Sequence, residues 1–435
     1  MTHRYMKQLN RTYERQTKLM EQSDGSRLHR GSDDSVAYSR MLRYKKDYDE
    51  NVQFQSNVKT AISYMKNSSA ALSNVSDNTK TLVEKVNAAQ GTNTTSDMQA
   101  ISAEMLVLVQ ESVSALNMQV GGKFLFSGQA SLTQPFVMSS EKVDRAITMT
   151  LDPSQASAYN RLVVQEGGTP NTDLEFVTLS SGSSTYFWDT KNSWVISADM
   201  STKYGVPGEP SSDGKYWIPE YISELVDSEG KLREGITQPV KVTVCVGEET
   251  DASGNKVYKT EELELDVATQ FMVSYYGDTK SYSIPKENGA VQPLSDTANA
   301  SGLDVMGENV FDNIASGADI SACVSALNDM LAIVAKADTG ESCANWMSAV
   351  GKTMANNAFD TFNGAQTKLA ARQQAYESSL TMLESQEEYI LNDITDVSST
   401  DVAKLAVNMM ELQTTYQLSL SVGSRILPPT LADYL

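Results

Sequence analysis

The spacing of apolar residues predicts long helices at the N-terminal end of the chain. Large side chains recur there at steps of three and four residues, as on one face of an amphipathic helix or coiled coil: Met6, Leu9, Tyr13, Gln16 and Met20. A second run with this spacing extends from Met41 to Val86, and a third from Ile101 to Val120. Gly121 and Gly122 are expected to end the third run. The second run predicts a helix of about 50 residues, roughly 75 Å long at about 1.5 Å per residue.

The middle of the chain changes to alternating and β-branched patterns, which predict strands. Hairpins are expected where Trp188 and Trp194 flank a turn, and again around a turn near Gly254 and Asn255. The segments expected to be strands are 146–151, 161–166, 175–179, 241–246, 259–267 and 270–276. This middle part therefore predicts a β-rich domain inserted into a helical chain.

Helical spacing returns toward the C-terminus, over 320–334, 369–391 and, after the polar gap 392–400, over 402–416. The two ends mirror each other, so we predict a mainly α fold in which they pair antiparallel as one elongated helical rod. The expected parts are terminal coiled-coil segments 1–31 and 398–435, a rod of 32–139 and 310–397, and the inserted β-rich domain 140–309. Apolar residues exposed on the terminal helices would mark association surfaces.

A short stretch between the first two helices, "GSRLHRGSDDSVAYSR", combines glycines, a histidine and an acidic pair. Gly25 and Gly31 provide the backbone freedom that a hinge needs. Ser32 is expected to cap the second helix, and Asp33 and Asp34 to lie in its first turn, where the helix dipole favours negative charge. His29 is then an ordinary exposed residue, and the stretch is a joint between helices.

Composition and motifs argue against nucleic-acid binding, membrane insertion and catalysis. The 55 Asp and Glu outnumber the 35 Lys and Arg, and a net charge of −20 repels nucleic acid and anionic membranes. No apolar window has the length of a membrane span, and no secretory signal is visible at the N-terminus. Three cysteines form no zinc or disulfide pattern, and only His3 and His29 could serve a catalytic triad. We therefore expect no enzyme activity, no cofactor and no metal.

The stretch "SDGSRLHRGSDDSVAYSR" resembles the turn and helix start of the flagellin superfamily of bacterial flagellar axial proteins. The matching positions are Ser23, Gly25, Arg27, Leu28, Asp33, Asp34 and Ala37. Within the superfamily it is most similar to the hook–filament junction proteins of the FlgL family. Gly31 and Ser35 stand where that family usually has proline, which predicts a more flexible joint.

Two further stretches carry the same resemblance, which covers about residues 1–137 and 310–435. "GGKFLFSGQASLTQPF" is similar to a junction-family stretch at Gly122, Phe124, Phe126, Gly128, Pro135 and Phe136. The C-terminal stretch resembles the family in its polar gap, its Gln-rich helix and its closing Leu-x-x-(Phe/Tyr)-Leu, whereas flagellins more often close differently.

The resemblance implies a structural protein that assembles as a ring and joins the first hook-associated protein to the flagellin filament. It also implies a flagellar export chaperone, export by the flagellar type III apparatus without a cleaved signal, and an extracellular location. The residues expected in the innermost assembled layer are Met6, Leu9, Tyr13, Met20, Leu405, Met409, Leu412 and Tyr416. Two other interpretations stay open: a flagellin subunit of the filament, or a surface glycan-binding protein that uses the tryptophans of the middle domain.

Overall fold

The computed structural model describes residues 2–91, 93–128, 130–165, 175–189, 194–200, 203–205, 225–227, 230–250, 256–277, 284–285, 291–292, 325–340 and 343–426. The chain forms two compact units. Unit 1 contains Met1–Thr60 and Tyr376–Leu435, and unit 2 contains Ala61–Ala375. Two long helices, α2 (Ser35–Ala89) and α8 (Lys352–Ser398), contribute residues to both units.

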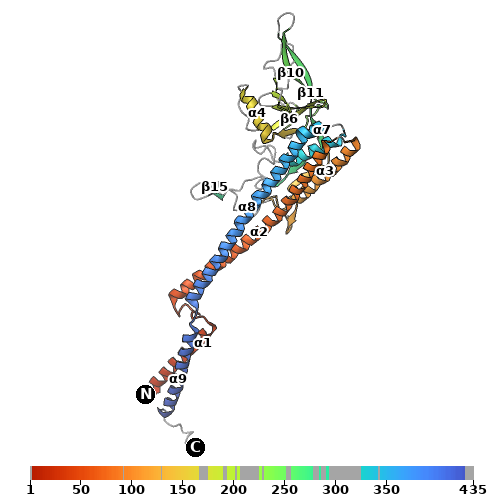
Figure 1. The fold of residues 1–435 in the computed structure, drawn as a ribbon. Helices are drawn as coiled ribbons and strands as arrows, with labels where there is room; N and C mark the ends of the chain where they lie inside the picture. The colour runs from red at the N-terminus through yellow and green to blue at the C-terminus, as the bar shows by residue number, and fades with distance from the viewer. Residues whose placement is uncertain are drawn as a thin grey trace. The chain divides into compact units, whose positions relative to one another are not determined.

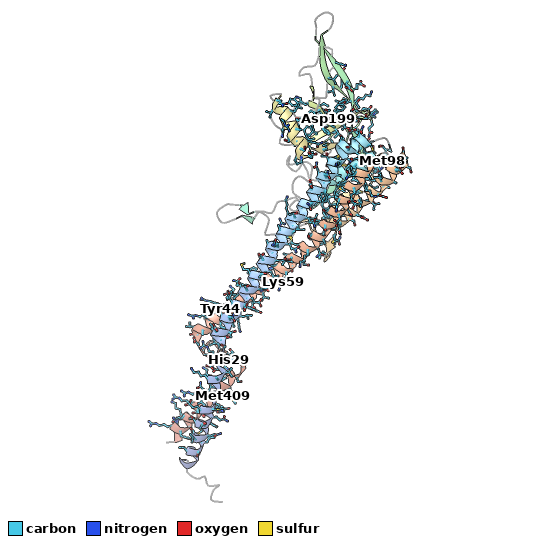
Figure 2. The ribbon with its side chains drawn as sticks, viewed as in Figure 1. His29, Tyr44, Lys59, Met98, Asp199 and Met409 are labelled. Atoms are coloured by element: carbon cyan, nitrogen blue, oxygen red, sulfur yellow. The ribbon has the colours of Figure 1, made fainter. Side chains whose placement is uncertain are left out.

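Unit 1 is helical and brings the two ends of the chain together. Helix α1 (Thr2–Glu21) lies beside α9 (Val402–Ile426) in antiparallel orientation, and the Tyr5 hydroxyl donates to the carbonyl of Ser419 at 2.8 Å (Figure 1). Near Lys59, α2 pairs in the same way with α8, where Lys59 Nζ lies 3.7 Å from Glu384 Oε1 (Figure 2). The predicted antiparallel pairing of the terminal segments is therefore present within this unit.

The long helices extend further than the sequence pattern indicated. Helix α2 has 55 residues, close to the expected 50, because apolar side chains continue at helical spacing along most of it. Helix α8 runs to Ser398, through most of the expected polar gap 392–400, so only residues 399–401 separate it from α9. Hydroxyl side chains are satisfied within the helix there, since Thr395 and Ser398 each donate to the carbonyl four residues earlier.

Unit 2 adds shorter helices to the long pair. Helix α3 (Thr95–Leu116) begins at a capping box formed by Thr94 and Asp97, and α6 (Ser325–Asp338) packs on it, where Ser102 Oγ donates to the Val334 carbonyl at 2.9 Å. Beyond α6, α7 (Ala344–Trp346) leads through a π-turn, η6 (Met347–Gly351), into α8. Of the predicted helix 320–334, the part before residue 325 lies outside the described residues.

The expected end of α3 was wrong by several residues. The helix stops at Leu116, and the Asn117 side chain then exchanges two hydrogen bonds with the backbone of Phe136, at 2.7 and 3.0 Å. Gly121 and Gly122, with φ of 61° and 77°, instead form the turn between β1 (Gln119–Val120) and β2 (Lys123–Phe124). Two aromatic residues of the following stretch, Phe126 and Phe136, are fully buried.

The inserted part of unit 2 is built on one antiparallel sheet with the strand order β10-β11-β6-β7-β8-β9, and β5 pairs with β6. Both expected hairpins form, although their turns lie outside the described residues. The strands of this sheet are β5 (Thr148–Thr150), β6 (Glu175–Ser181), β7 (Ser184–Asp189), β8 (Trp194–Ser197), β9 (Lys203–Gly205), β10 (Lys241–Thr250) and β11 (Lys256–Leu265). The chain is thus mainly α with an inserted β-rich part, as predicted.

Six further short strands form three separate two-stranded antiparallel sheets. Strand β3 pairs with β13 and β4 with β12, while β14 pairs with β15. Their bounds are β3 (Phe136–Met138), β4 (Val143–Ala146), β12 (Val267–Gln270), β13 (Val273–Tyr275), β14 (Ile284–Pro285) and β15 (Val291–Gln292).

The predicted strand 161–166 is wrong, because this stretch belongs to helix α4 (Pro153–Gln165). Asp152 precedes it and accepts hydrogen bonds from the backbone N–H groups of Ser154 and Gln155, both at 2.8 Å, which caps the helix. Tyr159 and Val163 are buried on its inner face. The β-branched Val163 and Val164 suggested a strand locally, but the cap and this packing override that preference.

A buried carboxylate connects the sheet to the helices of unit 2. Asp266, between β11 and β12, is 2% exposed and accepts hydrogen bonds from Ser180 Oγ at 2.9 Å, Lys336 Nζ at 3.2 Å and Trp346 Nε1 at 3.2 Å. These donors come from β6, α6 and α7. A charge buried this deeply needs such partners, so Asp266 fixes where the inserted part attaches.

Candidate assembly surface

The α1–α9 pair buries one stripe of each helix. On α1 the half-buried residues recur at steps of three and four: Tyr5, Leu9, Thr12, Gln16 and Leu19. On α9 the corresponding residues are Leu405, Asn408, Met409, Leu412, Tyr416 and Ser419, of which Leu405 is buried. We call these two stripes the seam. The spacing is that of a coiled coil, so each helix covers the apolar face of the other.

A second set of apolar side chains on α1 faces away from the seam. Met6, Tyr13 and Met20 lie seven residues apart and are 50%, 61% and 54% exposed. Residues seven apart share one side of a helix, so these three form a continuous exposed stripe. The sequence pattern merged this stripe with Leu9 and Gln16, whereas the structure separates the two sets.

Helix α9 carries an exposed apolar set of its own. Val407, Met410 and Leu418 are between 62% and 70% exposed, on the side of the helix opposite the seam. We call these residues, together with Met6, Tyr13 and Met20, the outer apolar positions. Unit 1 therefore has apolar surface left over after its own two helices have paired, which is typical of an association surface.

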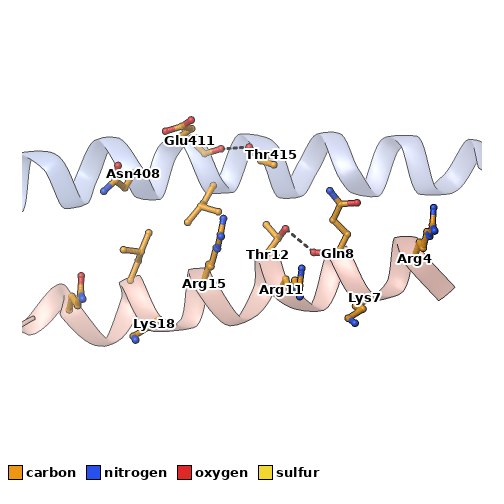
Figure 3. A pocket seen from close by; sticks show the side chains of 13 residues that line it. Arg4, Lys7, Gln8, Arg11, Thr12, Arg15, Lys18, Asn408, Glu411 and Thr415 are labelled. Atoms are coloured by element: carbon orange, nitrogen blue, oxygen red, sulfur yellow. Dashed lines mark hydrogen bonds between the residues drawn. The ribbon is translucent and has the colours of Figure 1, made fainter. Parts of the chain in front are cut away.

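A groove of about 990 Å³ runs between α1 and α9 (Figure 3). One wall is a row of cations on α1 that recur at steps of three and four, and the opposite wall on α9 contributes one acid, Glu411. We call it the basic groove. Its cations are Arg4, Lys7, Arg11, Arg15 and Lys18.

We call residues 22–34 together with 399–401 the joint. Backbone hydrogen bonds connect these two segments of the chain. Arg27 N donates to the Ser398 carbonyl at 2.8 Å, Thr400 N donates to the Gly25 carbonyl at 2.9 Å, and Ser26 bridges Ser399. The Arg27 guanidinium also donates through Nε to the Val397 carbonyl at 3.1 Å. The two helix breaks of the chain are thereby fastened to each other.

Only one of the two glycines at the joint needs to be glycine. Gly25 has a φ of 85°, in the left-handed region, and closes the short 3-10 helix η1 (Gln22–Asp24). Gly31 has no positive φ, and a side chain there would meet only the Tyr38 ring at an ordinary 3.5 Å. The backbone conformation therefore calls for glycine at position 25 but not at position 31, and hinge motion at either residue stays a prediction.

The cap of α2 is Asp34, not Ser32 as expected. Asp34 Oδ1 accepts hydrogen bonds from the backbone N–H groups of Val36 at 3.1 Å and Ala37 at 3.0 Å, because the helix begins two residues later than the sequence suggested. Ser32 lies in the turn before it.

Asp33 lies outside the first helical turn and ties the joint to α1. Its carboxylate accepts hydrogen bonds from the backbone of His29 at 3.2 Å and Arg30 at 3.0 Å, and pairs with Lys18 Nζ at 2.9 Å. The Lys18 ammonium and then the Arg30 N–H lower the pKa of Asp33 from 3.8 to about 2. His29 was expected to be an ordinary exposed residue. It is half-buried instead, and its Nε2 lies 2.8 Å from Asp24 Oδ2.

Comparison with known proteins gives a family match over the N-terminal part of the chain, which includes α1, the joint, α2 and α3. Residues 1–131 match the bacterial flagellin N-terminal helical region. This part of the chain is therefore similar to the N-terminal helical region of flagellins. No curated protein matches the chain.

Several solved flagellar structures resemble this chain at low identity. A putative flagellar hook-associated protein from Vibrio parahaemolyticus is 12% identical, with 84% of this chain and 100% of that chain covered and a TM-score of 0.41. FlgL of Xanthomonas campestris is 14% identical, with 82% and 99% covered and a TM-score of 0.36. The junction protein FlgL of Legionella pneumophila is 15% identical, with 79% and 99% covered and a TM-score of 0.31.

Membrane spans, metal sites and a carbohydrate platform are also to be considered in the described part of the chain. None of its helices could cross a membrane, and no group of three or more His, Cys, Asp or Glu is placed to hold a metal ion. Trp188 is 2% exposed, so the tryptophan hairpin cannot present both rings as a carbohydrate platform.

The residues expected in the innermost assembled layer fall into two groups in the structure, and their role in assembly stays a prediction. Leu9, Leu405, Met409, Leu412 and Tyr416 lie on the seam inside one subunit. Met6, Tyr13 and Met20 lie outside it, and the outer positions of α9 were missed. The signal for Val407, Met410 and Leu418 is a second row of apolar residues on α9, which becomes visible once the seam residues are set aside.

Proposed function

We propose that this protein forms the junction between the flagellar hook and the filament. The observation that carries the proposal is that the two terminal helices pair with each other and still expose the outer apolar positions. The junction rather than the filament is favoured by the stretch "GGKFLFSGQASLTQPF" and by the closing residues of the chain, which resemble junction proteins. The match of residues 1–131 to the flagellin N-terminal helical region is consistent with either place.

The outer apolar positions give the proposal its mechanism. In an assembly, Met6, Tyr13 and Met20 of one copy pack against a different face of the next copy, which is a heterologous contact. Such contacts form a ring when the rotation from each copy to the next adds up to a full turn, and an open helix otherwise. Each exposed apolar side chain that becomes buried contributes about 1.5–3 kcal/mol, so several per copy support a stable ring.

The proposed partners follow from a place at the junction. The ring contacts the first hook-associated protein on the hook side and flagellin on the filament side. Before assembly, the outer apolar positions need protection from aggregation, which an export chaperone provides, and the flagellar type III apparatus exports the chain without removing a signal peptide.

Deletion of the gene in the source bacterium tests the proposed function. We expect electron microscopy to show hooks without filaments, and immunoblots to detect flagellin in the medium. Re-expression of the native chain restores filaments and serves as the control. Hooks that still carry shorter filaments built from another flagellin would instead identify this protein as a filament subunit and overturn the junction role.

Substitution of the outer apolar positions tests the surface itself. In the complemented deletion strain, Met6→Asp with Tyr13→Asp is expected to reproduce the bare hooks, because charges cannot be buried between copies. The matched control is Thr17→Asp with Asn10→Asp, two exposed polar positions on the same helix. Filaments of normal number on the Met6 and Tyr13 variant would contradict the assigned surface.

A further inference from the structure

The cations of the basic groove are unusual for this chain and for their place in the helix. A protein with a net charge of −20 concentrates five cations on one face of α1, and the first turn of this helix contains no acid. Like charges spaced four residues apart repel, as Lys7, Arg11 and Arg15 do, and cations near a helix N-terminus oppose its dipole. The row is therefore unfavourable for the isolated helix.

The groove leaves most of this charge uncompensated within the described residues. Lys18 pairs with Asp33, whereas Arg4, Lys7, Arg11 and Arg15 make no ion pair in that part of the structure. In Figure 3, Arg4 and Arg15 extend from α1 toward α9, whereas Lys7 lies on the opposite edge of α1. A binding partner with negative charge would remove the repulsion and fill the groove.

The chain itself contains a segment of complementary charge. Residues 377–401, the last part of α8 and the short link to α9, hold seven Asp and Glu and no Lys or Arg. Glu388, Asp393 and Asp396 are exposed and make no ion pair within the described residues. The neighbouring Met382 and Tyr389, one heptad apart, are 65% and 72% exposed, so this surface is both acidic and apolar.

The acidic segment of the same subunit does not occupy its own groove. No groove residue comes from α8, whose acidic part is held along α2 instead. Gln55 Nε2 donates to Glu387 Oε2 at 2.6 Å, and Asn51 Nδ2 to Gln386 Oε1 at 3.4 Å. Both surfaces are thus available to a neighbour at the same time, as a head-to-tail contact between identical subunits requires.

We propose that the basic groove of one copy receives the acidic end of α8 of a neighbouring copy. This inference rests on the proposed assembly and adds a specific contact to it. The outer apolar positions supply most of the burial, whereas the opposite charges fix which surfaces meet and in what register. Exposed ion pairs of this kind weaken as salt screens them, so assembly becomes sensitive to ionic strength.

A charge-swap experiment in the complemented deletion strain tests the contact. Arg11→Glu with Arg15→Glu, and separately Asp393→Lys with Asp396→Lys, are each expected to reduce filaments per cell about tenfold, because like charges now face each other. The four substitutions together are expected to restore filaments to within about twofold of the native number. The matched control, Lys80→Glu with Lys352→Glu, makes the same charge change on exposed helix positions of unit 2 and should leave filaments unchanged.

Cross-linking provides a second readout that does not depend on charge reversal. Full-length protein carrying Arg11→Cys and Asp393→Cys, in isolated hook–filament complexes, should give disulfide-linked dimers and higher multimers on oxidation. Cys245, Cys323 and Cys343 are replaced by serine in every variant, and a variant with only one of the two new cysteines should not give the higher multimers.

Defined outcomes overturn the inference. Filament numbers unaffected by both reversals, a combined variant as defective as each reversal, or Arg11→Cys linked to a different protein would each exclude this contact between copies. These results are separable from failure of the proposed function, because the deletion strain would still show bare hooks.

Discussion

Asp33 and Asp34 are adjacent in the sequence but perform different tasks at the joint. Asp34 caps α2, whereas Asp33 connects the joint to Lys18 of α1. Sequence reasoning recognised the acidic pair and its proximity to a helix start. It placed the start two residues too early, because Ser32, Asp33 and Asp34 are all good capping residues and only the tertiary contacts decide between them.

Removal of the true cap should measurably destabilise the helix start. Asp34→Ala is expected to lower the free energy of unfolding of unit 1 by about 1 kcal/mol, because two backbone N–H groups lose their acceptor. Ser32→Ala is the matched control and should change it little. Urea denaturation followed by circular dichroism measures both, and a larger effect for Ser32→Ala would return the cap to that residue.

The Asp33–Lys18 contact predicts an acid-sensitive joint. The pKa of Asp33 is lower in the folded than in the unfolded chain, so its contribution to stability is complete above about pH 3.8 and is lost as the pH falls through about 2. Hydrogen exchange of the joint amides at pH values between these limits should show faster opening as the pH falls. Asp33→Asn should remove this part of the pH dependence, and an unchanged profile in that variant would contradict the assignment.

At the scale of elements, α9 has two apolar rows with opposite roles. Leu405 lies on the seam and is 7% exposed, whereas Val407 lies outside it and is 64% exposed. Leu405→Ala is expected to cost about 2 kcal/mol of stability, and Val407→Ala close to none. Denaturant unfolding of the two purified variants tests the difference, and equal losses would show that the seam is misassigned.

Sequence periodicity predicted elements well where the pattern was long. Between Met41 and Val86 the helical spacing of apolar residues repeats many times, so a few exceptions do not hide it. The length of α2 was therefore predicted to within a few residues. The shorter stretch 161–166 contains only a few β-branched residues, and the Asp152 cap with the burial of Tyr159 decides for a helix. The sequence pattern did not separate the seam of α1 from its exposed apolar stripe. Each residue of that stripe directly follows a seam residue in the sequence, so residues from both sets can be combined into one series with steps of three and four.

At the scale of the whole molecule, Asp266 anchors the inserted part of unit 2 to its helices. Asp266→Ala leaves the half-buried Lys336 ammonium and the buried Trp346 N–H without their acceptor, a change expected to cost about 1–3 kcal/mol. All four tryptophans lie between residues 188 and 346, so tryptophan fluorescence reports on unit 2 alone.

We therefore expect Asp266→Ala to lower the temperature of the fluorescence transition by several degrees. Asp227→Ala, at an exposed carboxylate of the same unit, is the control and should shift it less. Equal shifts in the two variants would show that the Asp266 cluster does not anchor the inserted part.

The backbone hydrogen bonds of the joint have a consequence for how the sequence can change in evolution. Arg27, Ser398, Gly25 and Thr400 meet mainly through N–H and carbonyl groups, which every residue except proline provides. Side chains around the joint can therefore drift among related proteins while the fastening persists, as Gly31 and Ser35 do in the place of the usual prolines. Gly25 is the exception, because its φ of 85° restricts the choice of residue, so a family alignment should show this position nearly constant amid variable neighbours.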